Sequence, residues 1–254
     1  MTPLLQAQGV AKRFGGHAAV RDVSFTLASG CIAGLIGPNG AGKTTLFNCL
    51  TGALHPSAGR VSLLGRDITG QRPDQVFRAG LARTFQIPRP FPEMTVLDNV
   101  MLAPPGQLGE RFWANWLRAA QVRRQEAQTL AAARHWLDFV GLSALEHQPA
   151  RVLSGGQRKL LELARVMVAQ PRLVLLDEPG AGVNPALLQQ IVERIAELNR
   201  QGVSFLIIEH NMDLVARLCH PVMVMAQGEL LTSGAADAVL SDPRVVEAYL
   251  GEAA

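Results

Sequence analysis

Three short, largely apolar runs predict buried strands. They cover residues 32–36 ("IAGLI"), 173–176 ("LVLL") and 203–208 ("VSFLII"). Runs of this length without polar alternation are typical of strands covered on both faces, as in a parallel sheet. A glycine or charged residues follow each run at once. We therefore expect polar chemistry where these strands end.

The composition is that of a globular protein with a sizeable core. The chain has 254 residues, 48% hydrophobic and 18% charged, enough for one large α/β domain or two small ones. The net charge of +3 and the pI near 9.1 suit a phosphate ligand or an anionic membrane surface. The bias is too small to indicate nucleic acid as a partner.

The beginning of the chain and its cysteines predict an unsecreted, reduced protein. The opening "MTPLLQAQGVAKRF" has no charged stretch followed by an apolar one, so we expect no signal peptide. No apolar run approaches the roughly 20 residues that span a bilayer. Cys31, Cys49 and Cys219 show neither a disulfide framework nor a metal-binding spacing, and we expect buried, reduced thiols.

A phosphate-binding loop follows the first run. "GPNGAGKTT" has the pattern G-x-x-x-x-G-K-[ST] between a predicted strand and a predicted helix, "LFNCLTG". Glycines let main-chain N–H groups converge on phosphate oxygens, and the helix N-terminus adds positive charge. We expect Lys43 to reach the β- and γ-phosphates and Thr44 to ligate Mg²⁺. The residues expected to bind the nucleoside triphosphate are Gly37, Pro38, Asn39, Gly40, Ala41, Gly42, Lys43, Thr44 and Thr45.

Two carboxylates end the second run, in "LVLLDEP". A buried strand that delivers Asp177 to its C-terminal edge is typical of the Mg²⁺ side of a phosphate-loop site. Glu178 is the next residue, so it points elsewhere, and we expect it to polarise a water that attacks the γ-phosphate. The alternative is a pair of solvated acids at a strand end.

The third run ends in Glu209 and His210, in "VSFLIIEH". A lone histidine after a strand is more often structural than catalytic. Its position at the ligand-binding edge of a parallel sheet nevertheless favours contact of His210 with the γ-phosphate.

A small uncharged stretch, "LSGGQ" at 153–157, lies about 20 residues before the carboxylates. It contains no acid, base or metal ligand, and its two adjacent glycines weaken a helix or a strand. In the order "GPNGAGKTT", "LSGGQ", "LVLLDEP", "IIEH", the motifs resemble the nucleotide-binding subunits of ABC transporters over essentially the whole chain. "LSGGQ" is the specific element, since the phosphate loop alone indicates only a P-loop NTPase.

The resemblance explains "LSGGQ" by a second chain. It implies that two copies pack head to tail, and that the signature of one closes over the γ-phosphate of the other, as an arginine finger does elsewhere. Ser154 would donate a hydroxyl, Gly155 and Gly156 would bring N–H groups close, and a helix starting near Gln157 would direct its dipole at the phosphate. Ser154 and Gly156 would thus take part in catalysis.

Three further positions match the family. Gln86, in "LARTFQ", corresponds to a glutamine that senses Mg²⁺ and water and links to the membrane subunits. Phe14 stands where an aromatic ring, usually tyrosine, stacks on adenine, the alternative being a core phenylalanine. Asn184, in "GAGVNP", replaces an aspartate of many members, so aspartate-based accounts of communication between the two sites do not carry over.

Other segments resemble the Liv-type branch, which energises the uptake of branched-chain amino acids. They are "RTFQIPRPFPEMTVLDNV", "EHNMDLV" and the terminal "SDPRVVEAYLGE". Similar subunits serve importers of urea and other small solutes. A stretch at 104–135, with Trp113, Trp116 and several arginines, is either a face near the membrane subunits or an amphipathic helix with a solvated arginine face.

We therefore expect an α/β fold, with a P-loop core built on a mainly parallel sheet, an antiparallel N-terminal β part and an inserted helical subdomain. The core would cover about 1–87 and 161–230, the helical subdomain about 88–160, and a C-terminal helical tail 231–254. The expected function is hydrolysis of ATP, with Mg²⁺, to drive import of branched-chain or related amino acids.

The expected partners are a second ATP-binding subunit, transmembrane permease subunits and, indirectly, a solute-binding protein. The chain would lie peripherally on the cytoplasmic face of the cell membrane. The alternative is a non-transport ABC ATPase that acts in assembly or as a scaffold, or an importer subunit for urea or another small solute.

Overall fold

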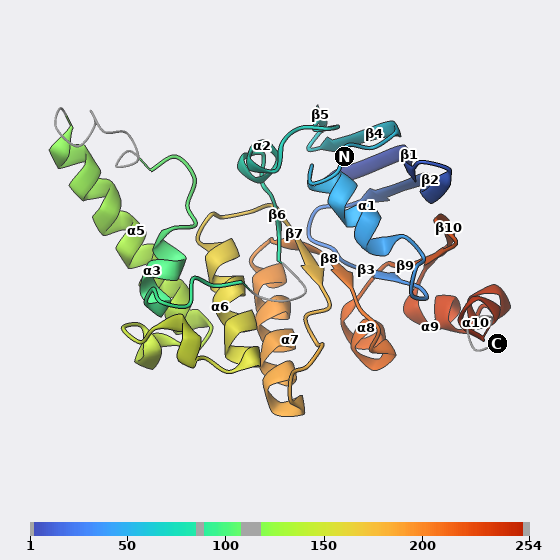
Figure 1. Ribbon diagram of the computed structural model, residues 1–254. Coiled ribbons are helices and arrows are strands. Elements are labelled where there is room, and N and C mark those ends of the chain that lie inside the picture. Colours follow the sequence, from blue (N-terminus) through green and yellow to red (C-terminus); the bar gives the residue numbers. More distant parts are fainter. Residues whose placement is uncertain (1–2, 85–88, 108–117, 251–254) are drawn as a thin grey trace. The chain divides into compact units, whose positions relative to one another are not determined.

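The computed structural model describes residues 3–84, 89–107 and 118–250. The chain divides into two compact units (Figure 1). The first comprises Met1–Gln86, Arg172–Ala181 and Ile195–Ala254, and the second comprises Ile87–Pro171 and Gly182–Arg194.

An antiparallel sheet forms the N-terminal part of the first unit. Its strand order is β2-β1-β4-β5. The strands are β1 (Leu5–Phe14), β2 (His17–Leu27), β4 (Ala58–Leu63) and β5 (Arg66–Asp67). In β1 the buried side chains of Leu5, Ala7 and Val10 are separated by half-buried or exposed positions, as expected for a sheet with one covered face.

A six-stranded sheet carries the three apolar runs of the sequence. Its order is β10-β9-β3-β8-β7-β6, with every neighbouring pair parallel apart from β10 and β9. The strands are β3 (Ile32–Ile36), β6 (Leu81–Arg83), β7 (Leu173–Asp177), β8 (Ser204–Ile208), β9 (Val222–Ala226) and β10 (Glu229–Gly234). Every residue of β3, β7 and β8 is buried, which explains why these strands lack polar alternation.

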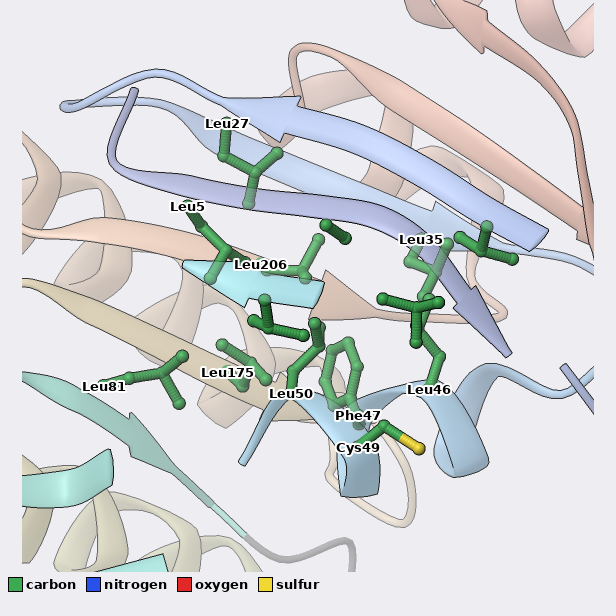
Figure 2. Close-up of a cluster of buried hydrophobic side chains, with 14 of the residues drawn as sticks. Leu5, Leu27, Leu35, Leu46, Phe47, Cys49, Leu50, Leu81, Leu175 and Leu206 are labelled. Atoms are coloured by element: carbon green, nitrogen blue, oxygen red, sulfur yellow. The ribbon is translucent and has the colours of Figure 1, made fainter. Parts of the chain in front are cut away.

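Helix α1 (Lys43–Leu50) lies in the core that both sheets share. Its Leu46, Phe47 and Leu50 pack in one cluster with Leu5 of the antiparallel sheet and Leu206 of the parallel one (Figure 2). Fully burying side chains of this size stabilises the fold by about 2 kcal/mol each. The helix that follows the phosphate loop is therefore anchored firmly at its apolar face.

The remaining helices of the first unit are short. They are α2 (Pro73–Arg78), α8 (Met212–Leu218), α9 (Ala236–Leu240) and α10 (Pro243–Leu250). Helix α8 covers the parallel sheet at Gly34, where an added Cβ would lie 3.1 Å from Cβ of Cys219. Helix α7 (Pro185–Arg200) contributes residues to both units.

The second unit is helical in its described part. Helices α3 (Val96–Met101), α5 (Ala119–Phe139) and α6 (Gly155–Met167) pack on one another, and short 3₁₀ turns cover Ser143–Leu145 and Ala150–Val152. The fully buried side chain of Asn99 donates to the main-chain oxygen of Phe91 at 3.0 Å and accepts from its N–H at 2.8 Å. This amide fixes the segment before α3.

The α/β fold with a mainly parallel core sheet, an antiparallel N-terminal part and a helical insertion is confirmed. Along 119–139 the helix α5 exposes Arg123, Arg124 and Arg134, which fits both interpretations of this stretch. Trp113 and Trp116 lie outside the described residues. Within the described ranges, no helix is both long and apolar enough to span a membrane.

Candidate functional site

Strand order brings the predicted chemistry to one edge of the parallel sheet. Strand β8 lies between β3 and β7, with Ile208 in register with Leu35 on one side and with Asp177 on the other. The phosphate loop, the two carboxylates and His210 therefore follow the C-terminal ends of three adjacent strands. This edge is where open α/β sheets bind their ligands.

The phosphate loop surrounds a cavity of about 310 Å³ in the first unit. Gly42 is the N-cap residue of α1, and its φ is +98°. A Cβ at this position would lie 2.3 Å from the main-chain oxygen of Ala19. The first turn of α1 has no acidic residue, so the helix N-terminus presents positive charge to the cavity. The described lining consists of His17, Ala19, Asn39, Gly40, Ala41, Gly42, Lys43, Thr44, Thr45, Glu178 and His210.

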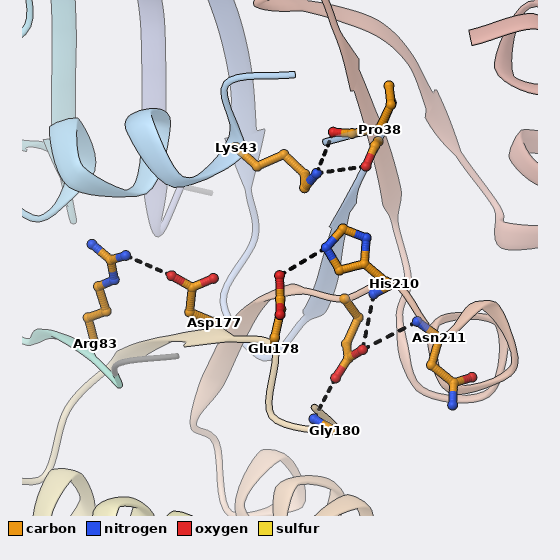
Figure 3. Close-up of polar contacts among 10 residues, drawn as sticks. Pro38, Lys43, Arg83, Asp177, Glu178, Gly180, His210 and Asn211 are labelled. Atoms are coloured by element: carbon orange, nitrogen blue, oxygen red, sulfur yellow. Dashed lines mark hydrogen bonds and ion pairs between the residues drawn. The ribbon is translucent and has the colours of Figure 1, made fainter. Parts of the chain in front are cut away.

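Lys43 is buried within its own loop. Its ammonium donates to the main-chain oxygens of Gly37 at 2.7 Å and Pro38 at 2.8 Å (Figure 3). These bonds hold the ammonium of Lys43, whose side chain belongs to the cavity lining. A phosphate in the cavity would therefore meet a cation already placed by the main chain, which lowers the ordering cost of binding.

Asp177 is paired with an arginine that the sequence interpretation missed. Arg83, at the end of β6, donates from Nη2 to Oδ2 of Asp177 at 2.7 Å (Figure 3). Its Nη1 donates to Oδ1 of Asn48. The guanidinium also lies 5.7 Å from the ring centroid of Phe47. Asp177 does not belong to the described lining of the cavity. No local sequence signal identifies this partner, because the pairing depends on β6 lying next to β7.

Glu178 leaves the line of its strand by a turn of the backbone. Its φ is +51°, a left-handed value that costs a residue with a side chain about 1 kcal/mol. Two main-chain hydrogen bonds hold Glu178 in this conformation. Its N–H donates to the main-chain oxygen of Ile208 at 2.9 Å, and its main-chain oxygen accepts from the N–H of Ala181 at 3.1 Å. The turn separates the two carboxylates, since Glu178 lines the cavity while Asp177 faces Arg83.

His210 holds the Glu178 side chain. Its Nε2 lies 2.9 Å from Oε1 of Glu178, and both side chains line the cavity (Figure 3). A carboxylate oxygen only accepts, so Nε2 carries the proton in this contact. The arrangement suits a carboxylate that must keep one direction while it receives a proton from water.

The "LSGGQ" residues belong to the second unit and begin helix α6. Ser154 is the N-cap: its Oγ accepts from the N–H of Gln157 at 3.3 Å, and Oε1 of Gln157 accepts from the N–H of Ser154 at 2.9 Å. The helix thus begins at Gly155, two residues earlier than the expected start near Gln157. The capping box explains the early start, because it satisfies end groups that the glycines leave open. Oγ of Ser154 still has its own hydrogen to donate.

The two glycines of this motif have different surroundings. Gly155 is exposed, and a Cβ there would meet no atom within 4 Å. Gly156 is buried, and its Cβ would lie 2.0 Å from Cδ2 of Leu187. The end of the Leu187 side chain thus packs closely on Gly156, and a side chain at 156 would force Leu187 to shift, whatever residue 156 contributes to phosphate binding.

Comparison with known proteins accords with this geometry. A family model described as "ABC transporter" matches residues 20–181, and one described as "Branched-chain amino acid ATP-binding cassette transporter" matches 229–254. A probable branched-chain amino acid transport ATP-binding protein, LivG, of Archaeoglobus fulgidus is 42% identical over 98% of this chain and 95% of its own length. This chain belongs to the ABC transporter family.

Two further members of the family show how far the likeness extends. The high-affinity LivG protein of Salmonella typhimurium is 42% identical over 99% of both chains. The solved ADP conformation of an ATP-binding cassette of an ABC transporter superposes with a TM-score of 0.84 at 36% identity, over 99% of this chain and 100% of that one. ATP binding and ATP hydrolysis coupled to transport are thus the activity of this ABC chain.

The other positions predicted from the family have varied surroundings. Phe14 is 48% exposed at the end of β1, with the ammonium of Lys12 5.2 Å from its ring centroid, so it is not a core side chain. Gln86 lies outside the described residues. Oδ1 of Asn184 accepts from the N–H of Leu187 at 2.9 Å, so the amide caps the first turn of α7. His17 and Ala19 of β2 line the cavity without any sequence signal.

Proposed function

We propose that this chain is the ATP-hydrolysing subunit of an importer for branched-chain amino acids. The observation that supports this solute is the match of residues 229–254 to the branched-chain amino acid transporter family. The ATP-binding motifs do not distinguish between solutes, because transporters of every kind share them. The names of the LivG relatives from Archaeoglobus and Salmonella support the same choice.

The cavity residues supply the parts that hydrolysis requires. Main-chain N–H groups of Gly40, Gly42 and their neighbours, with the ammonium of Lys43, would bind the phosphates at the N-terminus of α1. Phe14 would stack on adenine through its exposed ring. Glu178, fixed by His210, would orient the attacking water and take its proton.

The donor set suits Mg²⁺. A divalent ion of this kind is usually held by one or two protein oxygens together with phosphate oxygens and water. Among the described residues there is no cluster of three or more His, Cys, Asp or Glu side chains that could hold a metal ion. Thr44, in the cavity lining, and Asp177 would supply the protein oxygens. The ion would neutralise charge on the phosphates. Gln86 would complete the site, and Arg83 would keep one oxygen of Asp177 turned away from the nucleotide.

A second ATP-binding subunit would complete each site. Ser154, Gly155, Gly156 and Gln157 would close over the γ-phosphate held by the partner, with Gly155 exposed for that approach. Transmembrane permease subunits would be further partners, and a solute-binding protein would act through them. The chain would then lie peripherally on the cytoplasmic face of the membrane, without a role for nucleic acid.

Reconstitution tests the proposal. The chain would be co-purified in detergent with the membrane proteins encoded beside it and assayed in proteoliposomes with their solute-binding protein. We expect leucine-stimulated hydrolysis that requires Mg²⁺. Stimulation of hydrolysis by urea but not by leucine would identify urea, and not branched-chain amino acids, as the imported solute. An active ATPase without transmembrane partners would favour the assembly or scaffold alternative.

A further inference from the structure

Glu209 is a buried carboxylate that has no part in the hydrolysis proposed for this chain. It follows β8, the strand between those that carry the phosphate loop and the carboxylates, and only 3% of it is exposed. Burying a carboxylate is costly unless hydrogen bonds compensate for the lost water. The partners of Glu209 therefore indicate what the residue does.

Three main-chain N–H groups converge on this carboxylate. Oε1 accepts from Gly180 at 2.6 Å, and Oε2 accepts from His210 at 3.1 Å and from Asn211 at 3.3 Å (Figure 3). The donors come from two different loops, one after β7 and one after β8. Hydrogen bonds to an ionised acceptor are about twice as strong as neutral ones.

The same two loops carry the groups that orient water. Gly180 lies two residues after Glu178, and His210 follows Glu209 directly. Asn211 is also the N-cap of α8, where its Oδ1 accepts from the N–H of Leu214 at 3.1 Å. The Glu178–His210 side-chain bond and the Glu209 carboxylate thus tie the loops together at two places.

We propose that Glu209 is a positioning residue for hydrolysis: it holds the loops after β7 and β8 at the separation at which His210 bonds Glu178. The inference rests on the proposed roles of those two side chains. A carboxylate is required because both of its oxygens meet N–H donors. A glutamine could satisfy one side only and would direct its own N–H₂ at donors on the other.

Two substitutions of Glu209 and one control test the proposal in the full chain. Glu209→Gln keeps size and removes charge, while Glu209→Asp keeps charge but is one methylene too short to reach both loops. Glu229→Gln makes the same chemical change at an exposed carboxylate of β10. We expect kcat for ATP to fall about 100-fold in both Glu209 variants, as for a misplaced catalytic group, with ATP affinity within about threefold of wild type and the control unchanged.

Amide hydrogen exchange supplies a readout that does not involve hydrolysis. Without nucleotide, Glu209→Gln should speed exchange about tenfold or more at the amides of Gly180, His210 and Asn211, and leave the strands as protected as in wild type. Loss of protection throughout the chain would show a merely structural role. If Glu209→Gln does not fold, the kinetics of Glu209→Asp decide, and a kcat within about threefold of wild type would overturn the proposal.

A double-substitution cycle separates this inference from the function on which it rests. If Glu209 acts through His210, adding Glu209→Gln to His210→Ala should lower kcat by less than about threefold, whereas independent effects would multiply. Normal hydrolysis by His210→Ala and Glu178→Gln would refute the proposed catalytic roles. Large losses of hydrolysis in those two variants, together with normal hydrolysis by Glu209→Gln, would overturn only the positioning role of Glu209.

Discussion

Arg83 and Asp177 form an ion pair of 2.7 Å between the neighbouring strands β6 and β7, in which Asp177 is buried and Arg83 is half-buried. Because removal of one partner leaves an uncompensated charge in the interior, Arg83→Met should lower the free energy of unfolding by about 3 kcal/mol. Urea unfolding would measure the loss as a lower midpoint. Arg21→Met, at an exposed pair 3.9 Å from Glu229, is the control and should change stability by no more than about 0.5 kcal/mol. Equal losses in both variants would contradict a special role for the buried pair.

Glu178→Gln should nearly abolish turnover while sparing nucleotide affinity. The amide keeps the size of the side chain but cannot take a proton from water, and losing such a group costs about 3 kcal/mol of barrier, at least a hundredfold in rate. The ATP-loaded variant should accumulate as a dimer on size-exclusion chromatography. Near-normal hydrolysis by this variant would show that Glu178 does not take the proton of the attacking water.

Lys43→Ala should weaken ATP binding as well as catalysis, since an ammonium pairs with phosphate in the ground state and the transition state alike. The measurement is the rise in melting temperature on adding ATP, which grows with the excess of ligand over its dissociation constant. Wild type provides the reference, and each protein is compared with its own ATP-free sample because Lys43 also braces the loop. If ATP raised the melting temperature of Lys43→Ala as much as that of wild type, the result would contradict phosphate binding by Lys43.

Ser154→Arg should block hydrolysis without weakening ATP binding by the monomer. Ser154 is exposed, and in the proposed head-to-tail arrangement the added cation would obstruct the partner's γ-phosphate. Mixing this chain with Lys43→Ala tests the arrangement, because a mixed dimer holds one site with both halves sound. A site completed in trans predicts partial recovery of hydrolysis if one sound site acts alone. Weaker ATP binding by the Ser154→Arg monomer would mean that Ser154 contacts its own nucleotide.

Cys219 should make stability fall at alkaline pH. Burial, helped by the charge of Glu209, raises the pKa of its thiol from 9.0 to about 12. Between these values the native chain keeps a proton that the unfolded chain loses, so each pH unit above about 9 costs up to about 1.4 kcal/mol. Urea unfolding at about pH 8 and about pH 10.5 should show a smaller pH-dependent loss in Cys219→Ala than in wild type. Cys31→Ala, at a half-buried thiol, is the comparison and should change the slope less.

The sequence predicted the parts of the site that depend on strand ends. The runs before Gly37 and Asp177 had to be buried strands, and parallel strands bring their C-terminal ends to one edge, so the loop and the carboxylates could be placed together. Arg83 and Glu209 were missed as functional residues, because their roles depend on which strands are neighbours and on where main-chain N–H groups point. Neither property has a local sequence signal.

For the two glycines of "LSGGQ", too, the sequence predicted the surroundings of only one. Exposure of Gly155 agrees with a role toward another molecule, as the motif suggested. The close packing at Gly156 comes from Leu187, which lies 31 residues away in the sequence and packs on the start of α6. Close packing between distant segments was not visible in "LSGGQ" itself.

The left-handed backbone at Glu178 sets stability against activity at a single position. Asparagine adopts this conformation more readily than glutamate, so a Glu178→Asn chain would fold with less strain and yet lack the carboxylate that directs water. Selection for heat tolerance alone would therefore favour replacing the residue on which turnover depends. Directed evolution of a hardier variant has to screen for ATP consumption at every round, or it will enrich well-folded, inert proteins.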